Sequence, residues 1–394
     1  MSSSTSYNRA PVAAVVCLGI GVLAGAWGAR VGTRALEHAR AVQLLSEAAL
    51  IVCLFCTGLR ISTPLDLAAW RVPLRLAIVT LPATVALIAG TANVFLGLPF
   101  AQALLLGAVL GPTDPVLVSD LEVRAPDEEQ AVRFTLTAEG ALSSGFALPL
   151  VLFALGVSGH RDLGPLALRW LTLDVIWSLA AGALLGALAG VLGSQALARF
   201  GPRNPAGASE LGFGEVTLFA ALVALVYGAS VLVHANGFVA VLAAGTTLAR
   251  GGAPWVRSAA TPRMARALAC AAGRVERLAE LAMVIVLGAL LAVSRVRPAL
   301  VLFALLVLVA IRPLAARLGL GASGASEPQR RLIAWFGIRG VASLYLVMFC
   351  VGEGLSTSVA SELIAITLAV LATSIAVHGL TAFPLAKRPI DQRG

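Results

Sequence analysis

Residues 104–123 read LLLGAVLGPTDPVLVSDLEV, an apolar segment of bilayer length that is interrupted at its centre. Two glycines, Gly107 and Gly111, precede the pair Pro112 and Pro115, and Asp114 lies between the two prolines. Proline has no backbone N–H and blocks the carbonyl four residues earlier, so a helix breaks there. Within a bilayer the freed backbone groups must face protein, water or an ion. The stretch therefore predicts a broken membrane helix with an acid at the break.

The composition places the whole chain in the membrane. Of its 394 residues 59% are hydrophobic and 12% are charged, and the mean hydropathy is +0.91. Soluble chains carry about twice that charge. The basic residues behind the net charge of +9 lie between the apolar runs, where lipid head groups account for them and nucleic acid is not needed as a partner. We expect an all-α polytopic membrane protein.

Runs of about 20 apolar residues predict about twelve transmembrane helices. They lie near 12–29, 41–59, 74–96, 99–119, 131–156, 168–193, 212–233, 235–249, 277–294, 298–316, 331–351 and 358–385. A cleaved signal peptide is the alternative for the first run, but the run is long for one. The segments between the runs are too short for a soluble domain, so residues 1–394 are expected to form one transmembrane domain.

The distribution of arginine and lysine predicts the orientation. If the N-terminus is inside, the inner segments hold most of the 29 basic residues, with Arg312 counted among them. This bias predicts a multi-pass protein of the inner, or plasma, membrane with both termini in the cytoplasm. The five cysteines fall mostly within apolar runs, where they are expected to pack as small hydrophobes.

A second interrupted span mirrors the first. Residues 335–347 read WFGIRGVASLYLV, and Gly337 and Gly340 bracket Arg339. A charge at the bilayer centre costs about 2.5 to 3.5 kcal/mol on insertion scales, so such residues are candidates for function. Two broken helices in opposite halves of a chain indicate inverted repeats with a binding site at the midplane, near half-helix ends that carry partial charges.

Five motifs carry a resemblance to a known family. They read GAVLGPTDPVLVSD (107–120), VRFTLTAEGALSSGFALPLV (132–151), YGASVLVHANGFVAVLAAG (227–245), WFGIRGVASLYLV (335–347) and SIAVHGLTAFPLAK (374–387). In this order and spacing they resemble the monovalent cation:proton antiporters, in the sodium/proton exchanger branch that contains the NhaP-like proteins.

The resemblance implies an architecture. It implies a homodimer in which two inverted repeats form the core, near 74–156 and 298–385, with broken spans 4 and 11 crossing inside it. The helices near 12–59 and 212–294 would form the dimer bundle, and the helix near 168–193 would link the two parts.

The resemblance also implies a site. In the family, a glutamate in the fifth span is followed four and five residues later by Asn-Asp, and that aspartate binds the cation and the proton in turn. Here Glu139 matches the glutamate, but Ser143 and Ser144 occupy the Asn-Asp positions. Thr113 and Asp114 would complete the ion site, and Arg339 would be the charge partner of Glu139.

The serines change what the site can do. Residues four apart share a helix face, so Glu139 and Ser143 can line one cavity, with Ser144 adjacent. An antiporter needs a negative group that a proton or a cation can neutralise. Serine oxygen can coordinate a hard cation, but serine does not titrate near neutral pH. If Arg339 pairs with Glu139, the pair is already neutral; if Arg339 turns elsewhere, Glu139 is free to exchange.

The function expected from the sequence is antiport of H+ against Na+ or K+ by alternating access. The alternative is the same fold without conventional exchange, acting as a leak, a carrier of another small solute or a regulatory membrane protein. A serine hydrolase is the least favoured reading, because no GxSxG elbow is present and no sequence feature places a histidine beside Ser143 or Ser144. We therefore expect no enzyme activity and no cofactor.

Other polar residues are given structural interpretations. Asp120, Asp174 and Glu215 are expected to be interfacial or structural charges, and Glu47 a dimer-interface or core hydrogen-bonding group with transport as its alternative. His234 and His378 are expected to be satisfied interfacial histidines, with pH sensing as the alternative.

Overall fold

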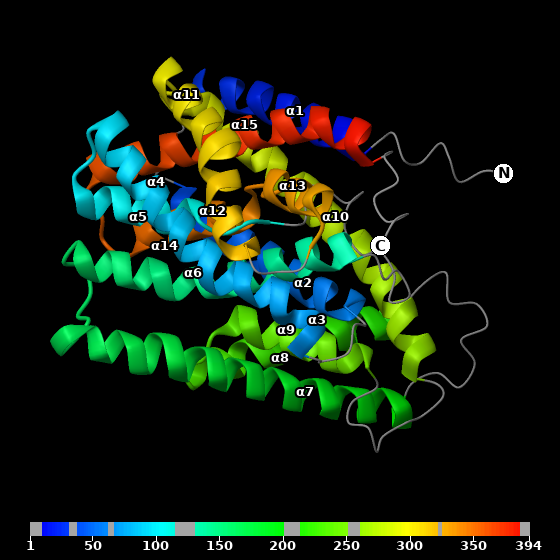
Figure 1. Cartoon of the computed structure of the whole chain (residues 1–394). Helices are drawn as coiled ribbons and strands as arrows, with labels where there is room; N and C mark the ends of the chain where they lie inside the picture. The colour runs from blue at the N-terminus through cyan, green and yellow to red at the C-terminus, as the bar shows by residue number, and fades with distance from the viewer. Residues whose placement is uncertain are drawn as a thin grey trace.

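The computed structural model describes residues 10–30, 38–61, 67–114, 131–200, 213–250, 261–321 and 325–386, and every regular element within them is helical (Figure 1). The elements are α1 (Ala10–Arg30), α2 (Ala39–Arg60), α3 (Leu67–Arg75), η2 (Leu76–Thr80), α4 (Leu81–Leu96), α5 (Phe100–Leu110), α6 (Ala131–Val157), η4 (Pro165–Ala167), η5 (Trp170–Trp177), α7 (Ser178–Phe200), α8 (Phe213–Leu232), α9 (Gly237–Ala249), α10 (Thr261–Val293), α11 (Pro298–Leu306), η6 (Val307–Ile311), α12 (Arg312–Leu320), α13 (Glu327–Trp335), α14 (Val341–Gly352) and α15 (Thr357–Ala386).

Six of these helical segments are long and apolar enough to cross a membrane. Five shorter apolar helices accompany them within the described residues. The expectation of an all-helical chain with several membrane spans is confirmed, while the count of twelve stays a prediction. Side chains facing outward on η5 and α7 are largely apolar, including Ile176, Leu184 and Leu188, as lipid contact requires.

The two predicted breaks are present, and they lie against each other. Helix α5 ends at Leu110, and residues 111–114 are not helical. The second interruption covers residues 336–340 between α13 and α14. A backbone hydrogen bond joins them, because the N–H of Asp114 donates to the carbonyl oxygen of Ile338 at 2.8 Å. The remainder of the first interrupted segment, including Asp120, lies outside the described residues.

A π-helical segment precedes each broken helix. The segment η2 lies between α3 and α4, and η6 lies between α11 and α12. Helix α12 packs against η2, and α4 packs against η6. A π turn inserts an extra residue, so it rotates the side chains that follow it. Arg312 is the first residue after η6, and this position directs it into the core.

Proline inside α6 creates a link to α9. Pro149 lacks an N–H, so the carbonyl of Gly145, four residues earlier, has no helical donor. The side chain of Asn236 donates to that carbonyl at 2.8 Å. The carbonyl side of the same amide caps α9, since it accepts from the N–H of Val239. One asparagine therefore satisfies the freed carbonyl inside α6 and caps the N-terminus of α9, and it holds the two helices side by side.

Glycines allow α7 to approach α9 at backbone distance. A Cβ on Gly186 would overlap the carbonyl of Ala240, and one on Gly182 would lie 2.6 Å from the carbonyl oxygen of Asn236. Packing of this kind between small residues is a common way for membrane helices to associate. Gly90 on α4 is the opposite case, because a Cβ there would meet open space.

Alanine at these glycines should change stability in opposite directions. Gly186→Ala is expected to lower the free energy of unfolding by about 1 to 3 kcal/mol, because α7 must move away from α9. Gly90→Ala is expected to raise it by up to about 1 kcal/mol, since alanine favours the helix and meets no neighbour. Thermal unfolding in detergent, followed by tryptophan fluorescence, measures both. Equal shifts of the two variants would contradict the packing described here.

Candidate ion site between two broken helices

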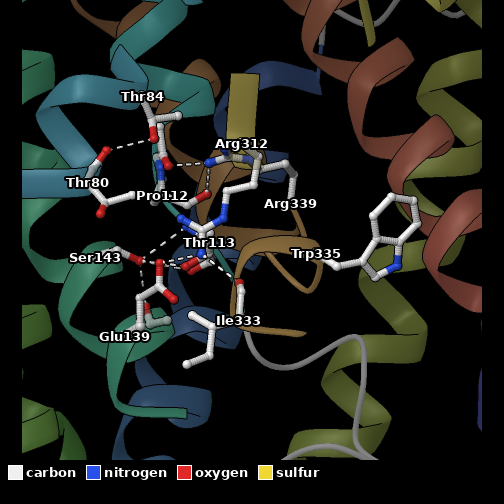
Figure 2. A network of polar contacts seen from close by, with 12 residues as sticks. Thr80, Thr84, Pro112, Thr113, Glu139, Ser143, Arg312, Ile333, Trp335 and Arg339 are labelled. Atoms are coloured by element: carbon white, nitrogen blue, oxygen red, sulfur yellow. Dashed lines mark hydrogen bonds and ion pairs between the residues drawn. The ribbon is translucent and has the colours of Figure 1, made fainter. Parts of the chain in front are cut away.

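The first break is tied to α6 through Thr113 and Ser143. The N–H of Thr113 donates to Ser143 Oγ at 3.1 Å, and the two hydroxyl oxygens are 3.2 Å apart. The Ser143 hydroxyl also lies 3.1 Å from the carbonyl oxygens of Thr113 and Gly140. Both side chains are buried. The structure thus brings together two of the predicted site residues, with several oxygens in one place (Figure 2).

Ser144 is buried next to this cluster, but its hydroxyl bonds within its own helix. Ser144 Oγ donates to the carbonyl of Gly140 at 2.8 Å. An aspartate at this position would bring a buried negative charge. The serine brings a neutral hydroxyl that is already satisfied, so it adds no charge for a cation to neutralise.

Glu139 forms a buried ion pair with Arg312. Arg312 Nη2 lies 2.6 Å from Glu139 Oε1, and both side chains are 3% exposed. The same Nη2 lies 3.4 Å from the carbonyl oxygen of Ile333 near the end of α13. The expectation that Arg339 pairs with Glu139 is therefore wrong, because the Arg339 guanidinium donates to the carbonyl oxygens of Gly111 and Pro112. Figure 2 shows Arg312 reaching Glu139 from the opposite side of the core.

Arg312 is the residue that sequence reasoning missed. Its placement among the inner loop charges is wrong, because it is 2% exposed and lies at the start of α12. Gly337 leaves room for it, since a Cβ there would overlap Arg312 Nε. One signal pointed to Arg312: the apolar run 298–316 contains this arginine four residues before its end.

Arg339 bonds to the end of α5. Its Nη1 donates to the carbonyl oxygens of Gly111 and Pro112, the latter at 2.8 Å, and the side chain is fully buried. The C-terminal end of a helix carries partial negative charge. Arg339 therefore neutralises the end of the first half-helix from a position on the second break.

Asp114 places a negative charge at the positive end of the other half-helix. Its Oδ2 accepts from the N–H of Ala342 at 3.4 Å, in the first turn of α14. The N-terminal end of a helix carries partial positive charge, so a carboxylate is favoured there. Each break thus supplies the charge that faces the other half-helix. Within the described residues, Glu139, Asp114, Arg312 and Arg339 place two negative and two positive formal charges around the two breaks.

The remaining candidates lie away from this cluster. The Glu47 carboxylate accepts from the Tyr227 hydroxyl, which agrees with the expected hydrogen-bonding role. Asp174 lies 3.4 Å from Arg161, as a structural charge would. His234 is exposed. His378 is 2% exposed and has hydrogen-bond partners on both ring nitrogens, which agrees with a satisfied histidine, while its depth in the membrane stays a prediction. The side chain of Glu215 is not among those described.

A second buried ion pair was also missed. Arg60 Nη2 lies 2.5 Å from Glu276 Oε1, and it joins α2 to α10. Arg60 and Glu276 each lie one position outside a predicted span, 41–59 and 277–294, but their side chains are 9% and 3% exposed. This pair fixes the two helices beside each other.

Two broken helices that meet at buried, opposed charges are an arrangement typical of secondary transporters. Residues 9–388 match the family described as sodium/hydrogen exchanger, transmembrane, and the chain belongs to this family.

Two relatives and two solved structures resemble the chain. The "K(+)/H(+) antiporter NhaP" of Alkalimonas amylolytica is 27% identical over 88% of this chain, which spans 57% of that relative's length. The "Na(+)/H(+) antiporter 2" of Zygosaccharomyces rouxii is 29% identical over 104 residues, 26% of this chain and 13% of that relative. Two structures of the sodium proton antiporter MjNhaP1 from Methanocaldococcus jannaschii are 18% identical and cover 96% of this chain, with 99% and 97% of their own chains covered and TM-scores of 0.64 and 0.68. These structures share the fold.

Proposed function

We propose that this protein is a secondary antiporter that exchanges H+ for Na+ or K+. Membership of the sodium/hydrogen exchanger family and the antiport functions of the named relatives support this proposal. The observation that carries it is the buried Glu139 carboxylate on the same face of α6 as Ser143, whose hydroxyl meets the oxygens of Thr113 at the first break. Carboxylate, carbonyl and hydroxyl oxygens are the ligands that hard cations prefer.

In the proposed mechanism, Glu139 is the exchanging acid, and Arg312 competes with the proton and the cation for its carboxylate. Three positive partners can neutralise the carboxylate: the Arg312 guanidinium, a proton or the transported cation. Arg312 Nη2 already donates to both Glu139 and the carbonyl of Ile333. When a cation displaces the guanidinium from Glu139, the Ile333 carbonyl can therefore still accept its hydrogen bond. Exchange of one proton for one cation at a single carboxylate is electroneutral.

The proposed architecture extends the fold described above. We place twelve spans in the plasma membrane with both termini in the cytoplasm, and the two broken helices cross in the core. Inverted repeats are supported by the matching order of the halves, because a helix with a π turn comes before each break. The core comprises α3 to α6 and α11 to α15, the dimer bundle comprises α1, α2 and α8 to α10, and α7 links them in a homodimer.

One observation favours a second function. Arg312 already neutralises the Glu139 carboxylate, and Ser144 contributes no charge, so a cation bound at this carboxylate would meet a neutral pair unless Arg312 moves. On this alternative the protein has the antiporter fold but has lost conventional exchange, and it acts as a leak, a carrier of another small solute or a regulatory membrane protein.

Proteoliposomes with a trapped pH dye separate the two functions. Pulses of Na+, K+ and Li+ are expected to evoke proton movement with at least one of Na+ and K+. If none of the three cations evokes proton movement at any pH, the second function is favoured. Ser144→Asp then tests the cause: if exchange appears only in this variant, the missing carboxylate is what abolished it, and if the wild type already exchanges, the variant should change the coupling.

The two serines should differ in their effect on cation binding. Ser143→Ala removes the hydroxyl that contacts Thr113, so we expect the apparent KM for the cation to rise about tenfold, the cost of roughly one good hydrogen bond or ligand. Ser144→Ala removes a bond within α6 and should change the KM less than threefold. Initial rates against cation concentration in proteoliposomes measure this, and a larger effect for Ser144→Ala would reverse the assignment of ligands.

A further inference from the structure

Both ends of the second break are held by one turn of α15. His378 Nε2 lies 3.1 Å from the carbonyl oxygen of Trp335, the last residue of α13. At the other end, the backbone N–H of Arg339 donates to Ser374 Oγ at 3.1 Å. The Ser374 hydroxyl oxygen lies 3.3 Å from His378 Nδ1. Ser374 and His378 are both buried and are four residues apart, so they share a helix face.

The bond to Trp335 has a fixed direction. The carbonyl of Trp335 can only accept, so His378 Nε2 must carry a proton. In the neutral imidazole Nδ1 is then an acceptor, and the hydroxyl of Ser374 can donate to it. Ser374 Oγ in turn accepts from Arg339. A continuous chain of bonds therefore runs from the Arg339 amide, through Ser374 and His378, to Trp335.

The surroundings of Nδ1 suit two forms of the ring. A ring protonated on Nε2 alone accepts from the Ser374 hydroxyl, and a doubly protonated ring donates to the Ser374 carbonyl, which lies 3.0 Å from Nδ1. In both forms Nε2 donates to Trp335 and Nδ1 contacts Ser374. Trp335 and Phe336 cover the ring, with centroid distances of 5.8 and 6.4 Å.

We propose that Ser374 and His378 form a positioning bridge that fixes the length of the second break and so the position of Arg339. Arg339 holds the carbonyls of Gly111 and Pro112 next to Thr113, so the bridge acts on the ion site through that arginine. Figure 2 shows Trp335 and Arg339, the two residues that the bridge connects. The effect on exchange rests on the proposed function, whereas the bridge itself does not.

Hydrogen–deuterium exchange tests the bridge without any transport measurement. The peptide that covers residues 336–340 contains the Arg339 amide, which loses its acceptor in Ser374→Ala. Its protection is expected to fall about tenfold, as for the loss of one buried hydrogen bond. Thr373→Ala is the matched control, because Thr373 is on the same helix and its hydroxyl bonds only to the Ala369 carbonyl of that helix. Unchanged protection in Ser374→Ala would overturn the proposal.

Variants of the histidine separate bonding from ring packing. His378→Phe keeps an aromatic ring against Trp335 but removes both polar contacts, so protection should fall as in Ser374→Ala. His378→Gln retains a donor near the Nε2 position and should keep part of the protection. If His378→Phe is as protected as the wild type, the ring acts by packing alone and the bridge is excluded.

A double-mutant cycle then connects the bridge to exchange. Ser374→Ala and His378→Phe interrupt the same chain, so the double variant should raise the cation KM no further than either single variant. Thr373→Ala with His378→Phe should be additive. If Ser374→Ala loses protection and the wild type shows no cation-evoked proton movement, the bridge is supported and antiport is not. If the wild type exchanges normally and Ser374→Ala keeps both its protection and its cation KM, the bridge is excluded and antiport is still supported.

Discussion

Glu139→Gln is expected to abolish cation-evoked proton movement. Glutamine has nearly the same shape, but it can neither release a proton nor supply the negative charge that a cation needs. In proteoliposomes with a trapped pH dye, the Na+ or K+ response should fall to the level of empty vesicles. Glu362→Gln is the control, since Glu362 lies 3.9 Å from Arg297 in an exposed ion pair and should exchange like the wild type.

Stability distinguishes a transport role from a structural one. Glu139→Gln leaves Arg312 buried without its counter-charge, and breaking such a pair costs about 3 to 5 kcal/mol. Replacing both residues, in Glu139→Gln with Arg312→Gln, should recover most of that loss. The recovered protein should still not exchange. A double variant that regains both folding and exchange would show that another acid, such as Asp114, carries the proton.

Arg339→Met is expected to have the second large effect. Methionine fills similar space but leaves the carbonyls of Gly111 and Pro112 without their donor, at about 1 to 3 kcal/mol for each. The variant should unfold at a much lower temperature in detergent and show little exchange. Arg331→Met is the control, because Arg331 is 79% exposed and pairs only with Glu327 one turn away, so its free energy of unfolding should change by less than about 0.5 kcal/mol.

Arg339→Lys refines the result. Lysine keeps the positive charge at the end of α5 but offers a compact ammonium in place of a planar fork. We expect intermediate stability, since one carbonyl can still be reached. If Arg339→Met and Arg331→Met unfold at the same temperature, the arginine does not stabilise the break.

The parts of the fold that follow from local chemistry could be predicted from the sequence. Gly111 and Pro112 at one site, and the glycines around Arg339 at the other, combine helix-weakening residues with a charge inside an apolar run, so both breaks were located correctly. Runs of bilayer length likewise predict helices, because lipid leaves the backbone few other choices. The meeting of the two breaks, with Asp114 bonded to Ile338, agrees with the pattern of two interrupted spans.

The pairing of charges could not be predicted in the same way. Glu139 and Arg312 are 173 residues apart, and their contact depends on a π turn and on the missing side chain of Gly337. Neither feature has a reliable sequence signal. The burial of His378 could not be predicted for a similar reason, because it depends on Trp335 from another helix.

The position of the bound cation tests the account most directly. A crystal structure of the protein soaked with Tl+, a heavy monovalent cation, should show anomalous density within coordination distance of the Glu139 carboxylate, the Thr113 oxygens and Ser143, with Arg312 Nη2 withdrawn toward Ile333. Density beside Asp114, with the Glu139–Arg312 pair still closed, would contradict the assignment of Glu139 as the exchanging acid.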